Sequence, residues 1–307
     1  MKPTLQDVRY DPILSNISVR YSNDTYIAEQ ILPVLQVGTR TGKYYKIAKD
    51  NFRIDHSFRA MGTAAREVGY DVSQSTAYVV DEHSLVQPVP DELKQQALRP
   101  LSPEVDATLN ITDKILVEKE YGLAAYMQST TNLTNNTTLA GVNQWSDYAN
   151  SSPLTDIRTG ITTIHGKIFK KPNVVVLGKE VYDKLLDHPD IVDRIKYSAL
   201  GVATTDLMAR LFGVEKVIVG GAGRNTATEG QTDSLSYVWG KYAWVLYVSP
   251  TPTINSVSFG YHFTHKPRMV DKWYDKVRKS TMVRVTDNYT KEIITVDAAY
   301  LIKNAIA

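Results

Sequence analysis

Residues 38–90 cannot form a hydrophobic core of their own, and this constrains the fold more than any other feature of the sequence. They are rich in polar residues and glycine, and they contain few large aliphatic side chains. Strand-like pieces at 44–48 and 77–80 predict a long two-stranded excursion. Because an isolated hairpin is only marginally stable in water, we expect its support to come from a neighbouring subunit.

The segment before this excursion, residues 1–37, has no sustained helical period. Its apolar residues Ile31, Leu32, Val34 and Leu35 lie on both sides of Pro33, which removes a backbone donor and interrupts regular structure. The pattern predicts an extended arm. An extended arm also needs another surface to lie against.

A long helix is predicted to begin at Ser102, which can cap it. Pro103 suits the first helical position, and Glu104 lies near the positive end of the helix dipole. Apolar residues then recur at spacings of four and seven, which predicts a helix of about 27 residues, about 40 Å long, buried along one face. The stripe consists of Val105, Leu109, Leu116, Leu123 and Met127.

Helix and strand patterns alternate from residue 152 to residue 219, which predicts a compact α/β unit. Ser152 and Pro153 open an amphipathic helix, and Thr205 is predicted to cap a short helix that ends at Gly213. The other predicted helices span 153–168, 179–186 and 191–197, and the predicted strands span 173–177 and 216–219.

The rest of the chain is predicted to be mainly β structure after a Gly/Thr-rich loop at 220–233. Residues 237–248 and 256–264 are strand-like, and alternation in the second predicts one buried and one wet face. Runs at 281–286 and 293–296 predict a hairpin that turns at Asp287 and Asn288. Residues 298–306 are expected to form a short helix or strand.

Composition excludes several classes of protein. With 307 residues and 43% apolar content, the chain can form a real core in one large domain or two ordinary ones. It has no cysteine, which excludes disulfides, thiolate nucleophiles and cysteine-based zinc sites. A net charge of +2, from 35 basic and 33 acidic residues, argues against a protein that binds nucleic acid mainly by neutralising phosphate.

Two further features concern location and contact. No run of 18 apolar residues could span a bilayer, and residues 1–10 lack the layout of a secretory signal, so we expect synthesis in the cytoplasm. Nineteen tyrosines against six phenylalanines favour extensive half-wet contact surfaces.

The order of these pieces resembles the tailed-bacteriophage major capsid proteins of the HK97-like fold, especially the lambda capsid-like branch. Local sequence agrees over nearly the whole chain. The residues that carry the resemblance are Gln144, Trp145, Ser146, Asp147, Ser152, Pro153, Leu154, Asp156 and Ile157, then 174–178, Leu185, His188, Pro189, Ile195, Lys196 and Tyr197.

The resemblance implies an α+β fold with five parts. These are an N-terminal arm (1–37), an extended loop (38–90), a peripheral domain with a spine helix (91–150), an axial domain (151–266) and a return to the peripheral domain (267–307). The chain shows no N-terminal coiled-coil scaffolding segment, so a separate scaffolding protein or none would be needed. No lysine and asparagine pair for covalent crosslinking can be assigned.

Motifs that carry chemistry are weak. Gly220, Gly221 and Gly223 follow a predicted strand, but Thr226 stands where a dinucleotide-binding turn needs its third glycine, so a flexible loop is favoured. In the resemblance this loop would lie near the tip of the axial domain. His262 and His265 lie in or beyond a strand, where residues three apart point to opposite faces, so a metal site is disfavoured.

The remaining candidates have simpler interpretations. His165 and His188 suit helix boundaries, and His56 and His83 lie in the polar excursion. Basic and aromatic residues at 266–279 could bind nucleic acid, but a solvated or subunit-facing segment balanced by acidic neighbours is favoured. Nucleophile elbows, phosphate-binding loops and zinc-protease helices are missing, so we predict no catalytic, cofactor-binding or metal-binding residue and no enzyme.

The sequence therefore predicts a virion shell subunit that forms hexamers and pentamers and closes into an icosahedral shell around double-stranded DNA, without sequence-specific binding and without a membrane. Scaffolding, portal and decoration proteins are the further partners that the resemblance implies. Two alternatives stay open: an encapsulin-like nanocompartment that encloses a cargo enzyme, and an α/β metabolic enzyme with a small-molecule pocket.

Overall fold

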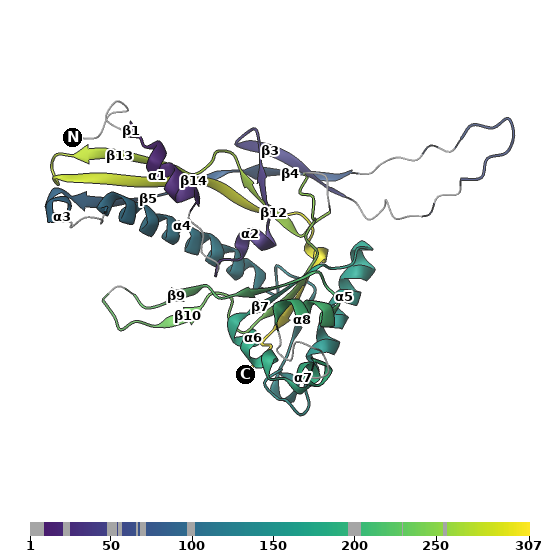
Figure 1. The fold of residues 1–307 in the computed structure, drawn as a ribbon. Helices are drawn as coiled ribbons and strands as arrows, with labels where there is room; N and C mark the ends of the chain where they lie inside the picture. Colours follow the sequence, from purple (N-terminus) through teal and green to yellow (C-terminus); the bar gives the residue numbers. More distant parts are fainter. Residues whose placement is uncertain are drawn as a thin grey trace.

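The structure is a computed structural model that describes residues 9–20, 25–47, 54, 57–65, 67, 72–96, 102–195, 204–228, 230–253 and 257–307. A long sheet with one long helix along it joins a separate α/β unit, and a thin hairpin projects away from both (Figure 1). This arrangement is α+β, as predicted. Among the described residues, no helix is both long enough and apolar enough to cross a membrane.

The long helix α4 (Pro103–Met127) begins where it was predicted, with Pro103 in its first turn beside Glu104 and Asp106. Ser102 stands at the predicted cap position, but its side chain makes no capping hydrogen bond. The predicted apolar stripe is only partly right. Ile111 and Ile115 are buried against the long sheet, whereas Leu109 and Leu116 are half-buried. The buried face also shifts around the helix, since its first half packs on the sheet and its second half reaches the α/β unit.

The long sheet is organised around β14 (Ser280–Ile293), which pairs antiparallel with three other strands. The predicted turn at Asp287 and Asn288 is wrong, because both residues lie inside this single strand and are buried. Two guanidinium nitrogens of Arg268 bond the Asp287 carboxylate, which makes its burial tolerable. The other strands are β1 (Arg9–Tyr10), β2 (Val34–Gln36), β5 (Asp81–Pro90), β12 (Gly260–Thr264) and β13 (Met269–Asp275).

The α/β unit contains a five-stranded sheet in the order β6 (Asn136–Thr138), β15 (Ala299–Lys303), β11 (Ala243–Leu246), β7 (Val174–Gly178) and β8 (Lys216–Gly220). Strands β7 and β8 pair in parallel, and the C-terminal tail, expected as a short helix or strand, is a strand. The flanking helices are α5 (Pro153–Ile168), α6 (Lys179–Leu186), α7 (Pro189–Ile195) and α8 (Thr205–Phe212). Thr204 caps α8, one residue before the predicted cap, and residues 196–197 lie outside the described part.

The N-terminal segment is not simply extended, contrary to the prediction. It contains α1 (Pro12–Arg20) and the short α2 (Ala28–Ile31). Asp11 caps α1 by accepting hydrogen bonds from the backbone of Ile13 and Leu14. Both helices are too short for a sustained period, so the capping pair of Asp11 and Pro12 was the available signal.

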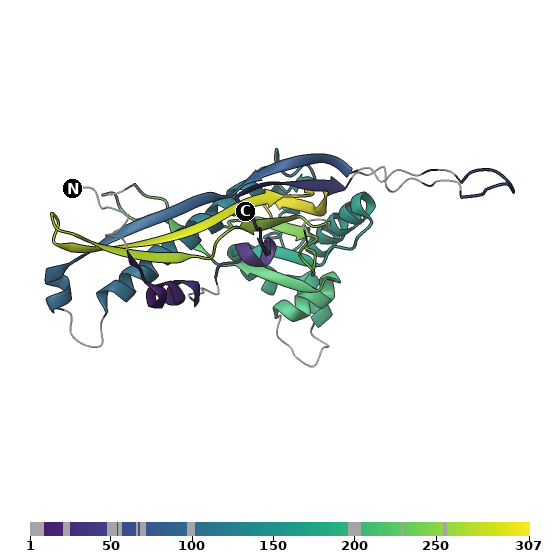
Figure 2. The ribbon, with the colours of Figure 1, turned by 90° about the horizontal axis from the view of Figure 1, so that it is seen from above.

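Two hairpins complete the fold. The first, β3 (Thr41–Ile47) with β4 (Val72–Val79), is the predicted two-stranded excursion, and β4 runs on through Val80 into β5 (Figure 2). The second pairs β9 (Gly223–Asn225) with β10 (Leu235–Tyr237) where a flexible loop was predicted. Short elements α3 (Asp91–Gln96), η2 (Gly141–Asn143) and η3 (Val296–Ala298) connect the parts.

Candidate assembly surfaces

The base of the β3–β4 hairpin is held by an aromatic cluster. Tyr44 and Tyr78 contact the Phe263 ring on β12, with ring centroids 5.8 and 4.8 Å apart. Gly42 makes room for this packing, because a Cβ atom there would lie 2.5 Å from the Tyr78 hydroxyl. The prediction that β12 has one wet face is wrong, since both Tyr261 and its neighbour His262 are buried. The aromatic contacts of Tyr44 and Tyr78 with Phe263 therefore anchor the hairpin where it leaves the long sheet.

The far end of the same hairpin is apolar and exposed. Ile54 is 93% exposed, Phe58 92% and Met61 102%. The described residues 57–65 lie at the end of the hairpin, far from both lobes (Figure 1). Large apolar side chains grouped at an exposed site are typical of a surface that another molecule covers. Residues 48–53, 55–56, 66 and 68–71 of the excursion lie outside the described part.

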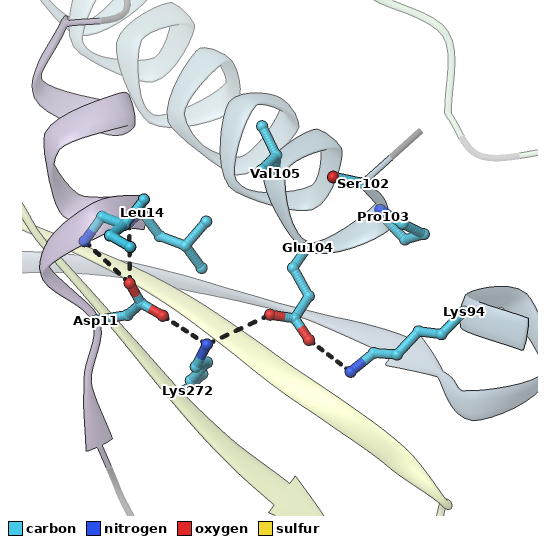
Figure 3. Close-up of a pocket in the computed structure, with 9 residues that line it drawn as sticks. Asp11, Leu14, Lys94, Ser102, Pro103, Glu104, Val105 and Lys272 are labelled. Carbon is cyan, nitrogen blue, oxygen red and sulfur yellow. Dashed lines mark hydrogen bonds and ion pairs between the residues drawn. The ribbon is translucent and has the colours of Figure 1, made fainter. Parts of the chain in front are cut away.

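A chain of ion pairs joins the N-terminal helix to the long sheet and to α4 (Figure 3). Lys272 on β13 lies 2.5 Å from Asp11 and 3.5 Å from Glu104, and Lys94 lies 2.6 Å from the other Glu104 oxygen. They line a pocket of about 360 Å³ whose apolar walls include Leu14. Burial raises the pKa of Glu104, but its contacts with Lys94 and Lys272 outweigh burial and hold that pKa below 4.5.

Glu120 on α4 makes the joint between the arm and the α/β unit. Its carboxylate accepts hydrogen bonds from the backbone N–H groups of Ile27 and Ala28, at 2.9 and 2.8 Å, and from the Trp239 indole at 2.6 Å. It thereby caps α2 from another element. Burial raises the pKa of Glu120, although these three donors favour the charged form.

His262 lies in a buried cationic environment between α4 and β14. It is 1% exposed, and neither ring nitrogen has a hydrogen-bond partner among the described residues. Lys291 stands opposite it in the β12–β14 ladder, and Lys119 on α4, paired with Glu29 at 2.7 Å, lies over the neighbouring Tyr289 ring. Burial, and then the charges of Lys119 and Lys291, lower the pKa of His262 well below 6.5.

One serine and histidine pair looks like a nucleophile with its base, but its hydrogen bonds do not fit that role. Ser151 Oγ lies 3.0 Å from His188 Nε2. His188 Nδ1 accepts the backbone N–H of Asp190, so the neutral ring carries its proton on Nε2 and donates it to Ser151. Ser151 in turn donates to the carbonyl of Asp147. The pair joins the start of α5 to the break before α7.

The glycine run belongs to the base of the β9–β10 hairpin. A Cβ atom on Gly220 would lie 2.3 Å from the Trp239 ring, so the glycine permits close packing there. The hairpin leaves the α/β unit alongside α4, where Arg224 stacks on Tyr121 at 4.2 Å (Figure 1). Its apolar side chains are exposed, Leu235 at 82% and Tyr237 at 44%.

The basic segment 266–279 forms β13 and the turn into β14. As predicted, acidic neighbours balance part of it, since Arg268 pairs with Asp287 and Lys272 with Asp11. His262 is buried on β12, whereas His265 is half-exposed near the carbonyl of Val37. Within the described residues, no three His, Asp or Glu side chains are grouped so that they could hold a metal ion.

Comparisons with known proteins agree with this architecture. The family model described as phage major capsid protein E matches residues 111–247. The major capsid protein of Burkholderia phage BcepMu is 29% identical over 95% of both chains. A crystal structure of a phage-related protein from Bordetella bronchiseptica RB50 is 26% identical, has a TM-score of 0.78, and is matched over 96% of this chain and 97% of that chain.

Over nearly its whole length, the chain is similar to major capsid proteins of phages. Its fold is that of HK97-like capsid proteins, since the capsid structure of cyanophage P-SCSP1u aligns with a TM-score of 0.61 over 92% of this chain and 89% of that chain, at 9% identity. The exposed ends of the two hairpins are the candidate surfaces for contact with another molecule.

Proposed function

We propose that this protein is a major capsid protein, and that it forms hexamers and pentamers that close into an icosahedral shell around double-stranded DNA. The observation that carries the proposal is the exposed apolar end of the β3–β4 hairpin, where Ile54, Phe58 and Met61 have almost no cover within their own chain. A neighbouring copy supplies that cover. Each buried contact adds about 25 cal/mol per Å² of apolar area, and the shell is stabilised by the sum.

The proposed division of labour follows five parts of the chain. Residues 1–37 are the arm, 38–90 the extended loop, 91–150 the peripheral domain with its spine helix, 151–266 the axial domain, and 267–307 the return to the peripheral domain. Within the loop, β5 pairs with β14 along its whole length, so it anchors the loop to the long sheet. The axial domain packs around the capsomer centre.

DNA is enclosed rather than recognised. The chain is close to neutral, and basic side chains such as Arg284 are held by carboxylates, here Asp271 at 2.7 Å. Such a surface gives little phosphate neutralisation. We further propose that the subunit is synthesised in the host cytoplasm, is not an enzyme, and meets scaffolding, portal or decoration proteins during assembly.

The experiment compares the full chain with a variant in which residues 48–71 are replaced by a short Gly/Ser turn. This deletion keeps β3, β4 and β5, so the pairing of β5 with β14 is preserved. We expect electron microscopy to show closed particles, or rings of five or six, for the full chain. The variant should remain as soluble small species with an unchanged circular dichroism spectrum apart from the lost segment.

Phe58→Ser in the full chain is the matched substitution, and Val277→Ser, at the exposed β13–β14 turn, is its control. Normal shells from the deletion variant would show that the hairpin does not link subunits. A full chain that stays monomeric with its scaffolding partner, and binds a small ligand instead, would overturn the shell. Small particles that hold a cargo protein would point to a nanocompartment.

A further inference from the structure

The outer edge of β5 is open over a short, defined window. Inside the described part of the chain, β5 pairs with β14 alone, and the register has no bulge. The backbone N–H of Asp91 bonds Lys279 on the β14 side, which makes the odd-numbered residues of β5 the ones that face β14. The N–H groups of Glu82, Ser84 and Val86 therefore face away from the sheet.

Both ends of this window are closed. At the start, the N–H of Val80 points outward and bonds the carbonyl of Arg40, so β3 covers that stretch of the edge. At the end, Pro88 and Pro90 occupy outward positions and have no N–H to offer. An added strand can consequently pair with residues 82–86 and no further. Prolines on an edge are a recognised way to limit such pairing.

Strand β10 has a matching free edge. The N–H of Val238 bonds Ala222 and the carbonyl of Ser234 accepts from Thr226, so even-numbered residues of β10 face β9. Leu235 and Tyr237 present their N–H and C=O groups outward. The side-chain oxygen of Asn225 accepts hydrogen bonds from the backbone N–H groups of residues 227 and 234, which hold the end of the hairpin in shape, so the strand is pre-organised for binding.

We propose that residues 82–86 of β5 accept β10 of a second copy as an added strand. This inference rests on the proposed self-assembly and names one of its contacts. The β3–β4 and β9–β10 hairpins point in opposite directions (Figure 1), so the side of one copy that carries β3 can meet the side of the next that carries β10. Head-to-tail contacts of this kind generate a ring when the rotation between copies closes.

The pairing also covers apolar surface on both sides. Leu235 and Tyr237 are exposed on β10, and Leu85 and Val86 are 38% and 43% exposed on β5. Backbone pairing supplies affinity, and the side chains beside it supply selectivity. Within one copy the two strands belong to separate sheets, so the contact must form between copies.

The test uses the absence of cysteine from the natural chain. In both antiparallel registers that fill the window, Ser84 lies opposite Leu235 or Tyr237. Assembled particles of Ser84→Cys/Leu235→Cys and of Ser84→Cys/Tyr237→Cys are treated with a short bis-maleimide. We expect one of the two pairs to give a ladder of covalent oligomers on denaturing gels, and Ser84→Cys/Val277→Cys to give none.

A second variant removes the outward N–H groups without touching the β14 ladder. Ser84→Pro/Val86→Pro should raise the critical concentration for assembly by about tenfold, whereas Ser84→Ala/Val86→Ala should change it little. Particles that form normally with neither cysteine pair crosslinked would overturn the inference and leave the proposed shell intact. A ladder of covalent oligomers from Ser84→Cys/Ala60→Cys instead would show that the β3–β4 hairpin of another copy lies along residues 82–86. That result would also overturn the inference.

Discussion

The α/β unit and the β3–β4 hairpin use apolar residues for opposite purposes. All five residues of β7 are buried within the unit, whereas the three large apolar side chains at the hairpin end are almost fully exposed. The first set is satisfied when one chain folds. In the proposed shell, the second set is covered when chains meet, so folding and association are assigned to different parts of the same sequence.

The largest expected effect comes from a pair of substitutions, one in the α/β unit and one in the β3–β4 hairpin, which test whether the two regions serve folding and association separately. Leu177→Ala should lower the free energy of unfolding of the subunit by about 3 kcal/mol, because it leaves a cavity in a fully buried strand. Phe58→Ser should change that free energy by less than about 0.5 kcal/mol and yet reduce assembly. Denaturant unfolding and particle yield measure the two effects. A large loss of subunit stability from Phe58→Ser would contradict the separation.

The next effect in size tests whether the arm belongs to the self-sufficient region. Glu120→Ala leaves the N–H groups of Ile27 and Ala28 and the Trp239 indole without their acceptor, and should cost about 2 kcal/mol. Hydrogen exchange at Ala28–Ile31 measures the local loss. Trp239→Phe, which removes only one of the three donors, should cost less. Unchanged protection of α2 would show that Glu120 is not its cap.

A smaller effect depends on pH and concerns the buried histidine between α4 and β14. The pKa of His262 is lowered well below 6.5 by burial and by Lys119 and Lys291. As the pH falls below 6.5 the unfolded chain binds a proton that the folded chain does not, so stability falls by on the order of 1 kcal/mol per pH unit. His262→Phe should lessen this slope in unfolding curves between about pH 7 and pH 5.5.

His188, whose pKa burial also lowers, should keep part of the slope in that variant. If the free energy of unfolding had the same pH dependence in the parent chain and in His262→Phe, burial of His262 would not contribute to the loss of stability in acid.

The smallest effect belongs to the ion pairs around Lys272. Lys272→Ala should cost about 0.5–1 kcal/mol, because these side chains are partly exposed and screened by water. Contacts with Lys272 help lower the pKa values of Asp11 and Glu104 against the opposing effect of burial, so their contribution is present above about pH 4.5 and is lost in acid. Hydrogen exchange in α1 at neutral and acid pH checks both points. If the hydrogen-exchange protection of α1 changed neither with Lys272→Ala nor with acid pH, the ion pairs of Lys272 would not stabilise α1.

Sequence reasoning succeeded where a signal is local. Pro103 and the acidic residues beside it marked the start of α4, and the polar, glycine-rich stretch marked the β3–β4 hairpin. It failed where the deciding partner is distant. The cap of α2 comes from Glu120, more than ninety residues along the chain, and Asp287 stays inside β14 because Arg268 neutralises it.

The candidate surfaces show the same limit. A two-stranded hairpin in the polar stretch was predictable from composition and turn residues. The open window on β5 was not, because it depends on which backbone groups face β14, and that alternation is fixed by register rather than by side-chain type. The prolines at 88 and 90 were visible in the sequence, but their meaning required the strand direction.

The unbroken passage from β4 into β5 has a mechanical consequence. A pull on the end of the hairpin travels along one strand and reaches the β5–β14 ladder parallel to the strand axis, so its hydrogen bonds are strained together rather than opened one after another. A shell linked through such hairpins would carry tension in backbone ladders, while the packed α/β units would be left largely undeformed.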